Sequence, residues 1–272
     1  YIAPGFVEDG TPIPPQRAVH EIDKALPADA ILVSDIGVHH NWLLQYCKPR
    51  GPTSLIGSMG FGPMGFGVAG VLGAKFAAPD RPCVSVCGAF GPDRDLRGTP
   101  EAQANSAKYL TDLIDQAVVL GAPVVAGPVY SAVGRIGGAE PAEYKKQWAM
   151  VVKNLKPICQ HAQKQGITLC VEPLNRFETD FINTVDQALK LVKDVGSPAL
   201  KVHLDTFHMN IEEKCQGGAI KKAGRLLGHF HACGSDRGTP GNDHIGWECI
   251  AKALKGAKYK GGVVIESFTK DV

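Results

Sequence analysis

Four acidic or histidine residues in the second half of the chain are regularly spaced, each near the end of a run that reads as a β-strand. The runs are ITLCVEPLNRFE, ALKVHLDTFHM, LLGHFHACGSDRG and GGVVIESFT, and the residues are Glu172, Asp205, His231 and Glu266. They are 33, 26 and 35 positions apart, about one strand and one helix each. In a parallel barrel the loops that follow the strands gather at one face. We therefore expect one shared site, where three carboxylates would repel one another unless a divalent cation lay between them.

From residue 83 onward, short β-rich runs alternate with longer amphipathic runs, which is the pattern of repeated βα units and a parallel sheet. Six strands are expected, at 83–90, 123–130, 167–174, 200–207, 227–234 and 261–268. The periodicity predicts helices between them, among them 100–120, 141–165 and 185–195. Glycines at positions 121, 166 and 196 are expected to end those three helices.

Six units fall short of a closed eight-stranded barrel, which typically needs about 250 residues. Residues 1–82 have an α-β-α-β-α order of their own, with strands expected at 30–35 and 53–58 and helices at 15–26, 39–47 and 64–78. If these two strands precede the strand at 83, the total becomes eight. We therefore predict an α/β fold of the (β/α)8 type, in which 1–82 is a separate segment that could complete the barrel and 83–272 is the main barrel region.

Composition excludes several kinds of partner. The formal net charge is +2 and charges of both signs are interspersed, so neither a nucleic acid nor an anionic membrane is expected. No apolar run approaches the roughly 20 residues of a membrane span, and the N-terminus lacks the regions of a signal peptide. Eight cysteines without a CxxC pair predict reduced thiols and a cytoplasmic location. Cys83, Cys87, Cys170 and Cys233 lie in strand-like runs, where a buried thiol is expected to act as a small hydrophobe.

The N-terminal third carries a glycine-rich run, GSMGFGPMGFGVAGVLG, in which Gly60, Gly62 and Gly65 formally match a dinucleotide fingerprint. Pro63 lies inside the turn and no strand-ending acid follows, so tight helix packing is the preferred interpretation. Residues 10–86 nevertheless resemble the cofactor-binding domain of thiamine-diphosphate enzymes, particularly the glyoxylate carboligase and acetolactate synthase group. That family continues into a GDG motif, whereas this chain reads VSVCGAFGPD. Because the required Asp is missing, thiamine diphosphate is not an expected cofactor.

The chain from residue 83 onward resembles a different family over about 190 residues. The motifs are VEPLNRFETDFINT, HLDTFHMNIEE, HFHACGSDRGTPGNDHIGW and VVIESFT. They are similar to those of the ketose 3-epimerases, which act on D-tagatose, D-psicose or L-ribulose and belong to the xylose-isomerase-like barrels. The resemblance implies a small ketose as substrate, a homo-oligomer (dimer or tetramer), and a divalent ion, Mn²⁺ before Mg²⁺ or Co²⁺. Its implied ligands are Glu172, Asp205, His231 and Glu266.

The expected chemistry requires such a set of residues. Inverting C3 of a ketose removes a proton next to a carbonyl and leaves negative charge on an enediolate, which a metal ion stabilises. Inversion also needs two acid/base groups, one on each face of the carbon. Glu172 and Glu266 are the expected pair. The resemblance further implies that Glu178, His208 and Arg237 contact the sugar.

Two departures from that family are expected to affect activity. The first strands come from the thiamine-enzyme-like segment, with a junction near residues 82–87 as in a fusion of two genes. The chain also reads only to Val272, where family members continue into a final helix. We therefore expect an atypical or incomplete barrel that lacks the last helix, with reduced activity.

Other interpretations stay open at this stage. His203 and His229 are expected to be core residues or to orient a metal ligand. Hydroxypyruvate isomerase, of the same barrel superfamily, is an alternative function. A non-catalytic sugar- or metal-binding remnant is another.

Overall fold

The computed structural model describes residues 15–34, 84–238, 240–241 and 243–266, and also 43, 45–48, 50, 55–57, 70, 73–75, 77, 78 and 80. The chain divides into two compact units. The first comprises Tyr1–Pro82, Pro240–Asp243 and Phe268–Val272, and the second comprises Cys83–Thr239 and His244–Ser267.

The first unit contains helix α1 (Pro15–Ala25) and two parallel strands, β1 (Leu32–Ser34) and β2 (Leu55–Gly57). These elements confirm the helix predicted at 15–26 and the strands predicted at 30–35 and 53–58. The two strands form a sheet of their own. Most residues of the helices predicted at 39–47 and 64–78, and the glycine-rich turn, lie outside the described residues. That this segment completes the barrel stays a prediction.

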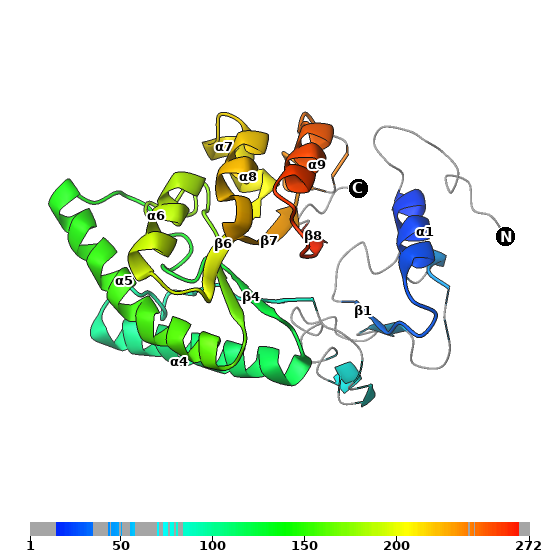
Figure 1. The fold of residues 1–272 in the computed structure, drawn as a ribbon, viewed down its shortest axis with the longest axis horizontal. Coiled ribbons are helices and arrows are strands. Elements are labelled where there is room, and N and C mark those ends of the chain that lie inside the picture. The colour runs from blue at the N-terminus through cyan, green and yellow to red at the C-terminus, as the bar shows by residue number, and fades with distance from the viewer. Residues whose placement is uncertain are drawn as a thin grey trace. The chain divides into compact units, whose positions relative to one another are not determined.

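The second unit contains one six-stranded parallel sheet whose strands follow in sequence order (Figure 1). The strands are β3 (Val86–Cys87), β4 (Val124–Gly127), β5 (Thr168–Val171), β6 (Leu200–Asp205), β7 (Leu227–Ala232) and β8 (Val263–Ile265). All six predicted strands are therefore confirmed. Each strand is shorter than its β-rich run, and in β4, β5, β6 and β7 the last residues of the run already belong to the segment that follows the strand.

Helices connect these strands on the outer side of the sheet (Figure 1). The three predicted helices are confirmed as α4 (Pro100–Leu120), α5 (Pro141–Lys164) and α6 (Val185–Val195). Gly121 and Gly196 cap α4 and α6 in the left-handed conformation, as expected. Sequence analysis did not predict α7 (Thr206–Glu212), α8 (Gln216–Ala223), the 3-10 turn Gly224–Leu226 or α9 (Trp247–Gly256). These helices have ten residues or fewer, too short to establish a clear period.

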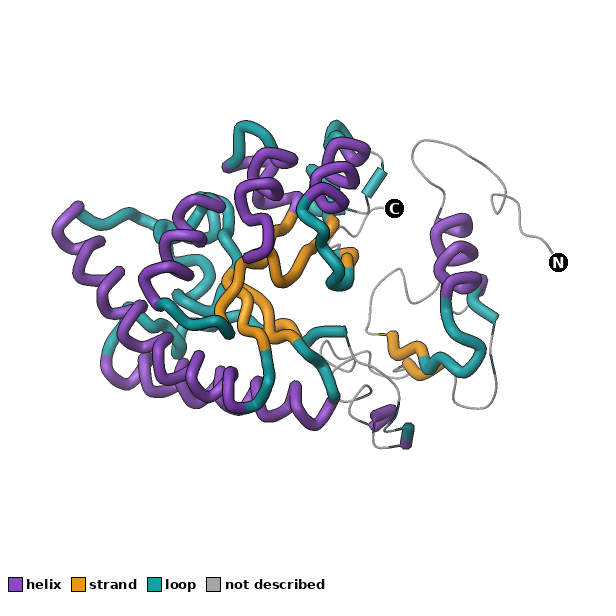
Figure 2. The backbone as a smooth tube through the Cα atoms, viewed as in Figure 1, coloured by secondary structure: helices purple, strands orange, loops and turns teal. Residues whose placement is uncertain are grey.

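The six-stranded sheet is strongly curled (Figure 2). Strands β4 and β7 contact each other although they are not neighbours in the sheet. The edges also approach each other where the edge strands begin, since a Cβ built at Gly262 would collide with Val84. Buried apolar side chains alternate along the strands with the residues of the predicted site and lie on the opposite face of the sheet, where the helices pack: Val125, Leu169, Val171, Val202, Leu204 and Phe230. This open, curled α/β arrangement is the incomplete barrel that the sequence predicts.

Seven cysteines lie among the described residues, and all are free thiols. Burial raises the pKa of Cys159 and of Cys170 to about 12, so both thiols are unreactive at neutral pH. Cys87 contradicts its prediction as a buried small hydrophobe, because it lies on edge strand β3 and is exposed. Within the described part of the chain, no helix combines the length and the apolar character needed to cross a membrane.

Gly127 ends β4 where the backbone of β3 passes very close. Its φ is 138°, and a Cβ there would collide with the Gly88 carbonyl oxygen. The Gly127 carbonyl accepts a hydrogen bond from the Glu172 amide at 3.1 Å, so this close approach also positions Glu172. We predict that Gly127→Ala lowers the free energy of unfolding, measured in urea, by about 1–3 kcal/mol.

Gly256→Ala at the end of α9 is the matched control, because a Cβ at Gly256 meets nothing within 4 Å. This variant is expected to be unchanged or up to about 1 kcal/mol more stable. A Gly127→Ala protein as stable as the control would contradict the close approach of β3 and β4.

Candidate active site and metal centre

The backbone brings the four predicted ligands to the carboxyl ends of neighbouring strands. Glu172 follows β5, Asp205 ends β6, His231 lies in β7 and Glu266 follows β8. Asp205 and His231 are direct partners in the register of β6 and β7. The Glu266 amide donates a hydrogen bond to the carbonyl of Ala232 at 3.2 Å, which ties it to the end of β7. Because the segments that follow parallel strands gather at one face, the backbones of all four residues lie along one rim of the sheet.

The side chains of these residues converge. His231 Nδ1 lies 3.5 Å from Glu266 Oε1 and 3.7 Å from Asp205 Oδ2. Donor atoms of Asp205, His231 and Glu266 lie within 4.8 Å of one another, and so do those of Glu172, Asp205 and His208. Glu172 and His231 share a third such group with His203. No group of described residues contains both Glu172 and Glu266, so Asp205 and His231 connect the two glutamates.

Burial and mutual repulsion change the charge state of Glu172. It is 5% exposed, and burial raises its pKa well above the usual range. The negative charges of Asp205 and Glu266 raise the pKa further, and His231 opposes them only in part. Burial and the neighbouring carboxylates therefore favour the neutral form of Glu172, and a bound cation would favour the charged form.

His231 carries the positive charge that these carboxylates attract. Burial alone would lower its pKa, but contacts with Asp205, Cys87 and Glu266 raise it to about 12. For Glu266, burial raises the pKa, and the contact with His231 and the charge of Arg237 outweigh that effect and lower it. A protonated His231 thus supplies positive charge that offsets the neighbouring carboxylates, as a bound cation would.

The donor set fits a divalent cation. Among the described residues, Glu172 Oε1 and His231 Nδ1 are buried and have no hydrogen-bond partner. Buried polar atoms in proteins are rarely left unpaired, so these two call for a ligand. Carboxylate oxygens with one imidazole suit Mn²⁺, Mg²⁺ or Co²⁺ better than ions that prefer thiolates.

The three residues predicted to contact a sugar lie beside these ligands. His208 Nε2 is 4.0 Å from Glu172 Oε1, and Arg237 Nη2 is 3.8 Å from Glu266 Oε2. Arg237 also pairs with Glu178. His208 and Arg237 therefore each lie beside one of the two glutamates, and Glu178 is linked to the site through Arg237.

Asn175 links two of these residues and was not singled out in the sequence. Its amide nitrogen Nδ2 lies 2.8 Å from Glu178 Oε1 and 2.9 Å from His208 Nδ1. Its backbone N–H donates to His208 Nδ1 at 3.1 Å, so Nδ1 is the acceptor and Nε2 carries the proton. The signal was its place in the NRFE motif, between Glu172 and Glu178.

His203 and His229 lie beneath the four ligands and are almost completely buried. Their rings pack against each other and against His231, with centroid separations of 4.1–4.9 Å. Burial lowers the pKa of His203 well below its usual value and that of His229 to about 4, so both are neutral. His203 Nδ1 lies 3.5 Å from Glu172 Oε2, next to a predicted metal ligand.

Two family models match the chain. The model for the xylose isomerase-like TIM barrel matches residues 72–271. The model for the C-terminal TPP-binding domain of thiamine pyrophosphate enzymes matches residues 35–91. Both resemblances stated from the sequence are thereby confirmed.

Curated proteins similar to this chain include D-psicose 3-epimerases. The chain is 37% identical over 171 residues to D-psicose 3-epimerase of Ruminiclostridium cellulolyticum, covering 63% of this chain and 58% of that protein. It is 45% identical over 132 residues to D-psicose 3-epimerase of Agrobacterium fabrum, covering 48% and 46%. The chain thus spans about half the length of these curated relatives.

A solved structure has the same fold. D-psicose 3-epimerase from Clostridium cellulolyticum H10, crystallised with D-tagatose, superimposes with a TM-score of 0.68 at 28% identity. The superposition covers 93% of this chain and 79% of that chain. The curled parallel sheet and the family model that matches more than half of the sequence agree, and the chain belongs to the xylose isomerase-like TIM barrel family.

Proposed function

We propose that this protein is a metal-dependent ketose 3-epimerase, which inverts C3 of a small ketose through an enediolate. The observation that carries the proposal is that Asp205 and His231 connect Glu172 with Glu266 at one rim of the sheet. Epimerisation needs two proton-transferring groups beside a site that stabilises negative charge, and this arrangement supplies both. The D-psicose 3-epimerases among the relatives favour the same reaction.

The proposed ligands of the divalent ion are Glu172, Asp205, His231 and Glu266. Several buried side-chain atoms of the described residues have no hydrogen-bond partner, and two of them, Glu172 Oε1 and His231 Nδ1, belong to proposed ligands, which supports this assignment. Mn²⁺ is the proposed ion, and Mg²⁺ or Co²⁺ would suit the same donors. When bound, the ion would supply Lewis-acid stabilisation of the charge that develops on the substrate oxygens.

The proposed acid/base pair is Glu172 and Glu266, which follow β5 and β8. One carboxylate takes the proton from C3, and the other returns a proton to the opposite face of the planar enediolate. The sugar loses one proton to the first glutamate and gains one from the second. Its configuration at C3 therefore changes while its formula stays the same. Closing the site against water would keep this exchange between the glutamates and C3.

The proposed sugar-binding residues are Glu178, His208 and Arg237. Because Asn175 donates to His208 Nδ1, the protonated Nε2 points its N–H toward Glu172 and is suited to donate to the substrate carbonyl oxygen. The Arg237 guanidinium lies over the ring of Phe207 at 4.8 Å and beside Glu266. Its permanent charge would stabilise a developing oxyanion without titrating.

The partners of the protein belong to the same proposal. A small ketose is the substrate, and a homo-oligomer in the cytoplasm is the proposed state. The free thiols support that location. Thiamine diphosphate has no place in the proposed reaction.

The test is an incubation of the full chain with D-fructose, L-ribulose or hydroxypyruvate in the presence of Mn²⁺. We expect one of the two ketoses to be converted to its C3 epimer, with activity lost in EDTA and restored by Mn²⁺. Chromatography of the products is the measurement. Conversion of hydroxypyruvate alone would favour hydroxypyruvate isomerase. Metal or sugar binding in calorimetry without turnover would favour a non-catalytic remnant.

A further inference from the structure

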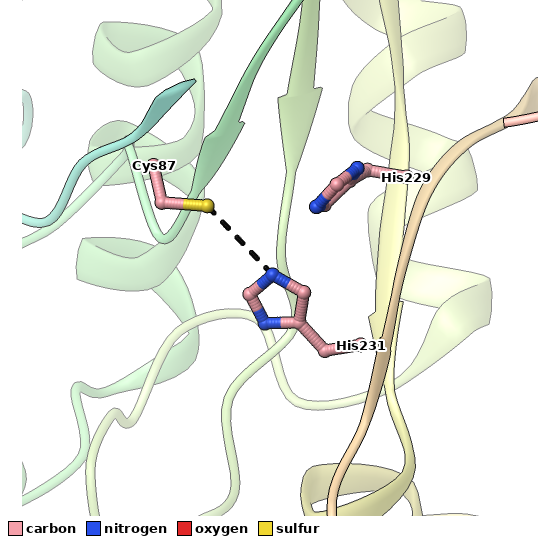
Figure 3. A group of neighbouring side chains, drawn as sticks. All are labelled: Cys87, His229 and His231. Atoms are coloured by element: carbon pink, nitrogen blue, oxygen red, sulfur yellow. Dashed lines mark hydrogen bonds between the residues drawn. The ribbon is translucent and has the colours of Figure 1, made fainter. Parts of the chain in front are cut away.

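A second group of side chains that could hold a metal ion shares His231 with the proposed metal centre, and Figure 3 shows this group. It consists of Cys87 on β3 and of His229 and His231 on β7. Donor atoms of the three residues lie within 4.8 Å of one another. The Cys87 thiol sulfur is 3.7 Å from His231 Nε2. The three side chains come from strands far apart in the sequence, so the curl of the sheet creates the group.

His231 faces two different chemical environments. Its Nδ1 lies among the carboxylates of Asp205 and Glu266, whereas its Nε2 faces the sulfur of Cys87. The first environment suits a hard cation. The second offers one sulfur and imidazole nitrogens, which select thiophilic ions such as Zn²⁺ or Cd²⁺.

His229 provides an independent indication that this group takes a ligand. It is 1% exposed, and among the described residues its Nε2 has no hydrogen-bond partner. Figure 3 shows one of its ring nitrogens turned toward Cys87 and His231. Cys87 is exposed, so an ion can reach the group from solvent. Three protein ligands would also leave a fourth tetrahedral position open to water.

We propose that Cys87, His229 and His231 form a second, thiophilic metal site, and that this site competes with the carboxylate site for His231. Binding of Zn²⁺ or Cd²⁺ releases the thiol proton of Cys87 to solvent. A neutral imidazole carries one proton. When an ion takes Nε2, the remaining proton is on Nδ1, the nitrogen that faces Asp205 and Glu266, and the hard ion loses its nitrogen ligand. The competition rests on the proposed function, whereas the thiophilic site itself does not.

Co²⁺ bound to the full chain tests the site directly. A thiolate bound to Co²⁺ gives a charge-transfer absorption band in the near ultraviolet, and oxygen or nitrogen ligands do not. We expect this band in the natural protein and in Cys249→Ser, a control at an exposed free thiol on α9. We expect it to be absent in Cys87→Ser. No band in the natural protein, or a band that persists in Cys87→Ser, would overturn the proposal.

Calorimetry with Cd²⁺ and Mn²⁺ separates the two sites. Cys87→Ser is expected to weaken Cd²⁺ binding by about tenfold or more and to leave Mn²⁺ binding within about twofold. Equal Cd²⁺ affinity in the two proteins would contradict the thiophilic site. Failure of Mn²⁺ to bind the natural protein would instead contradict the proposed function and leave the Cd²⁺ result intact.

The shared histidine is tested by adding excess Mn²⁺ to the Co²⁺-loaded protein. The charge-transfer band is expected to decrease as Mn²⁺ draws His231 Nδ1 to the carboxylate site. A band that Mn²⁺ does not change would show that the two sites bind ions independently.

Discussion

Glu172→Gln and Glu266→Gln are each expected to lower kcat for ketose epimerisation by about 10²–10⁴-fold. Glutamine keeps the size of the side chain and one oxygen ligand, but it cannot take up or return a proton. Both variants are expected to be affected, because inversion of C3 needs one group on each face. Initial rates measured at saturating sugar and Mn²⁺ give the comparison.

Glu248→Gln is the control for these variants, since Glu248 lies on α9 and its side chain is 93% exposed. Its kcat is expected to match that of the natural protein. A full rate in either active-site variant would remove that glutamate from the reaction. Release of deuterium from C3-labelled ketose would then identify which glutamate still takes the proton.

Arg97→Met is expected to lower the free energy of unfolding by about 3–5 kcal/mol, measured by urea denaturation. The Arg97 side chain is 1% exposed and lies in the loop after β3. Its Nε donates to Ser131 Oγ at 2.9 Å, its Nη1 donates to Gln147 Oε1 at 3.1 Å, and its Nη2 pairs with Asp180. Methionine preserves the volume but leaves the Asp180 carboxylate without its arginine, which is costly at a site largely removed from water.

The hydrogen bonds of Arg97 connect loops next to the proposed active site. Arg97, Ser131 and Asp180 lie in the loops after β3, β4 and β5, so one guanidinium joins three loops on the rim that carries the site. Lys108→Met is the control, because Lys108 is 77% exposed and pairs only with Asp112 among its ion-pair contacts in the described chain. It is expected to change stability by less than about 0.5 kcal/mol. Equal stability of the two variants would contradict the role of Arg97.

Much of the second unit follows from its sequence because the local signals agree with one another. Glu172, Asp205 and His231 each lie near the end of a β-rich run. Each run predicts a strand, and its polar residue predicts which end of that strand faces the site. Helices α4, α5 and α6 are marked by their periodicity and, for α4 and α6, by a capping glycine. Asp205 is both the last residue of β6 and the N-cap of α7, which begins at Thr206, so its strand-like run conceals the start of that helix.

The contacts between strands could not be predicted in the same way. The distance between Cys87 and His231 depends on how tightly the sheet curls, which no local pattern specifies. The exposure of Cys87 likewise depends on β3 being the edge of the sheet. The curl also determines how far apart Glu172 and Glu266 lie. Their donor atoms do not belong to one cluster, and Asp205 and His231 connect them.

The central claim is that one divalent ion is held jointly by Glu172, Asp205, His231 and Glu266. Crystals of the full chain soaked in Mn²⁺ test it through the anomalous scattering of manganese. The account predicts one strong peak within about 2.0–2.3 Å of a donor atom from each of these four residues. A strong peak elsewhere, or a peak reached by only one or two of them, would contradict it.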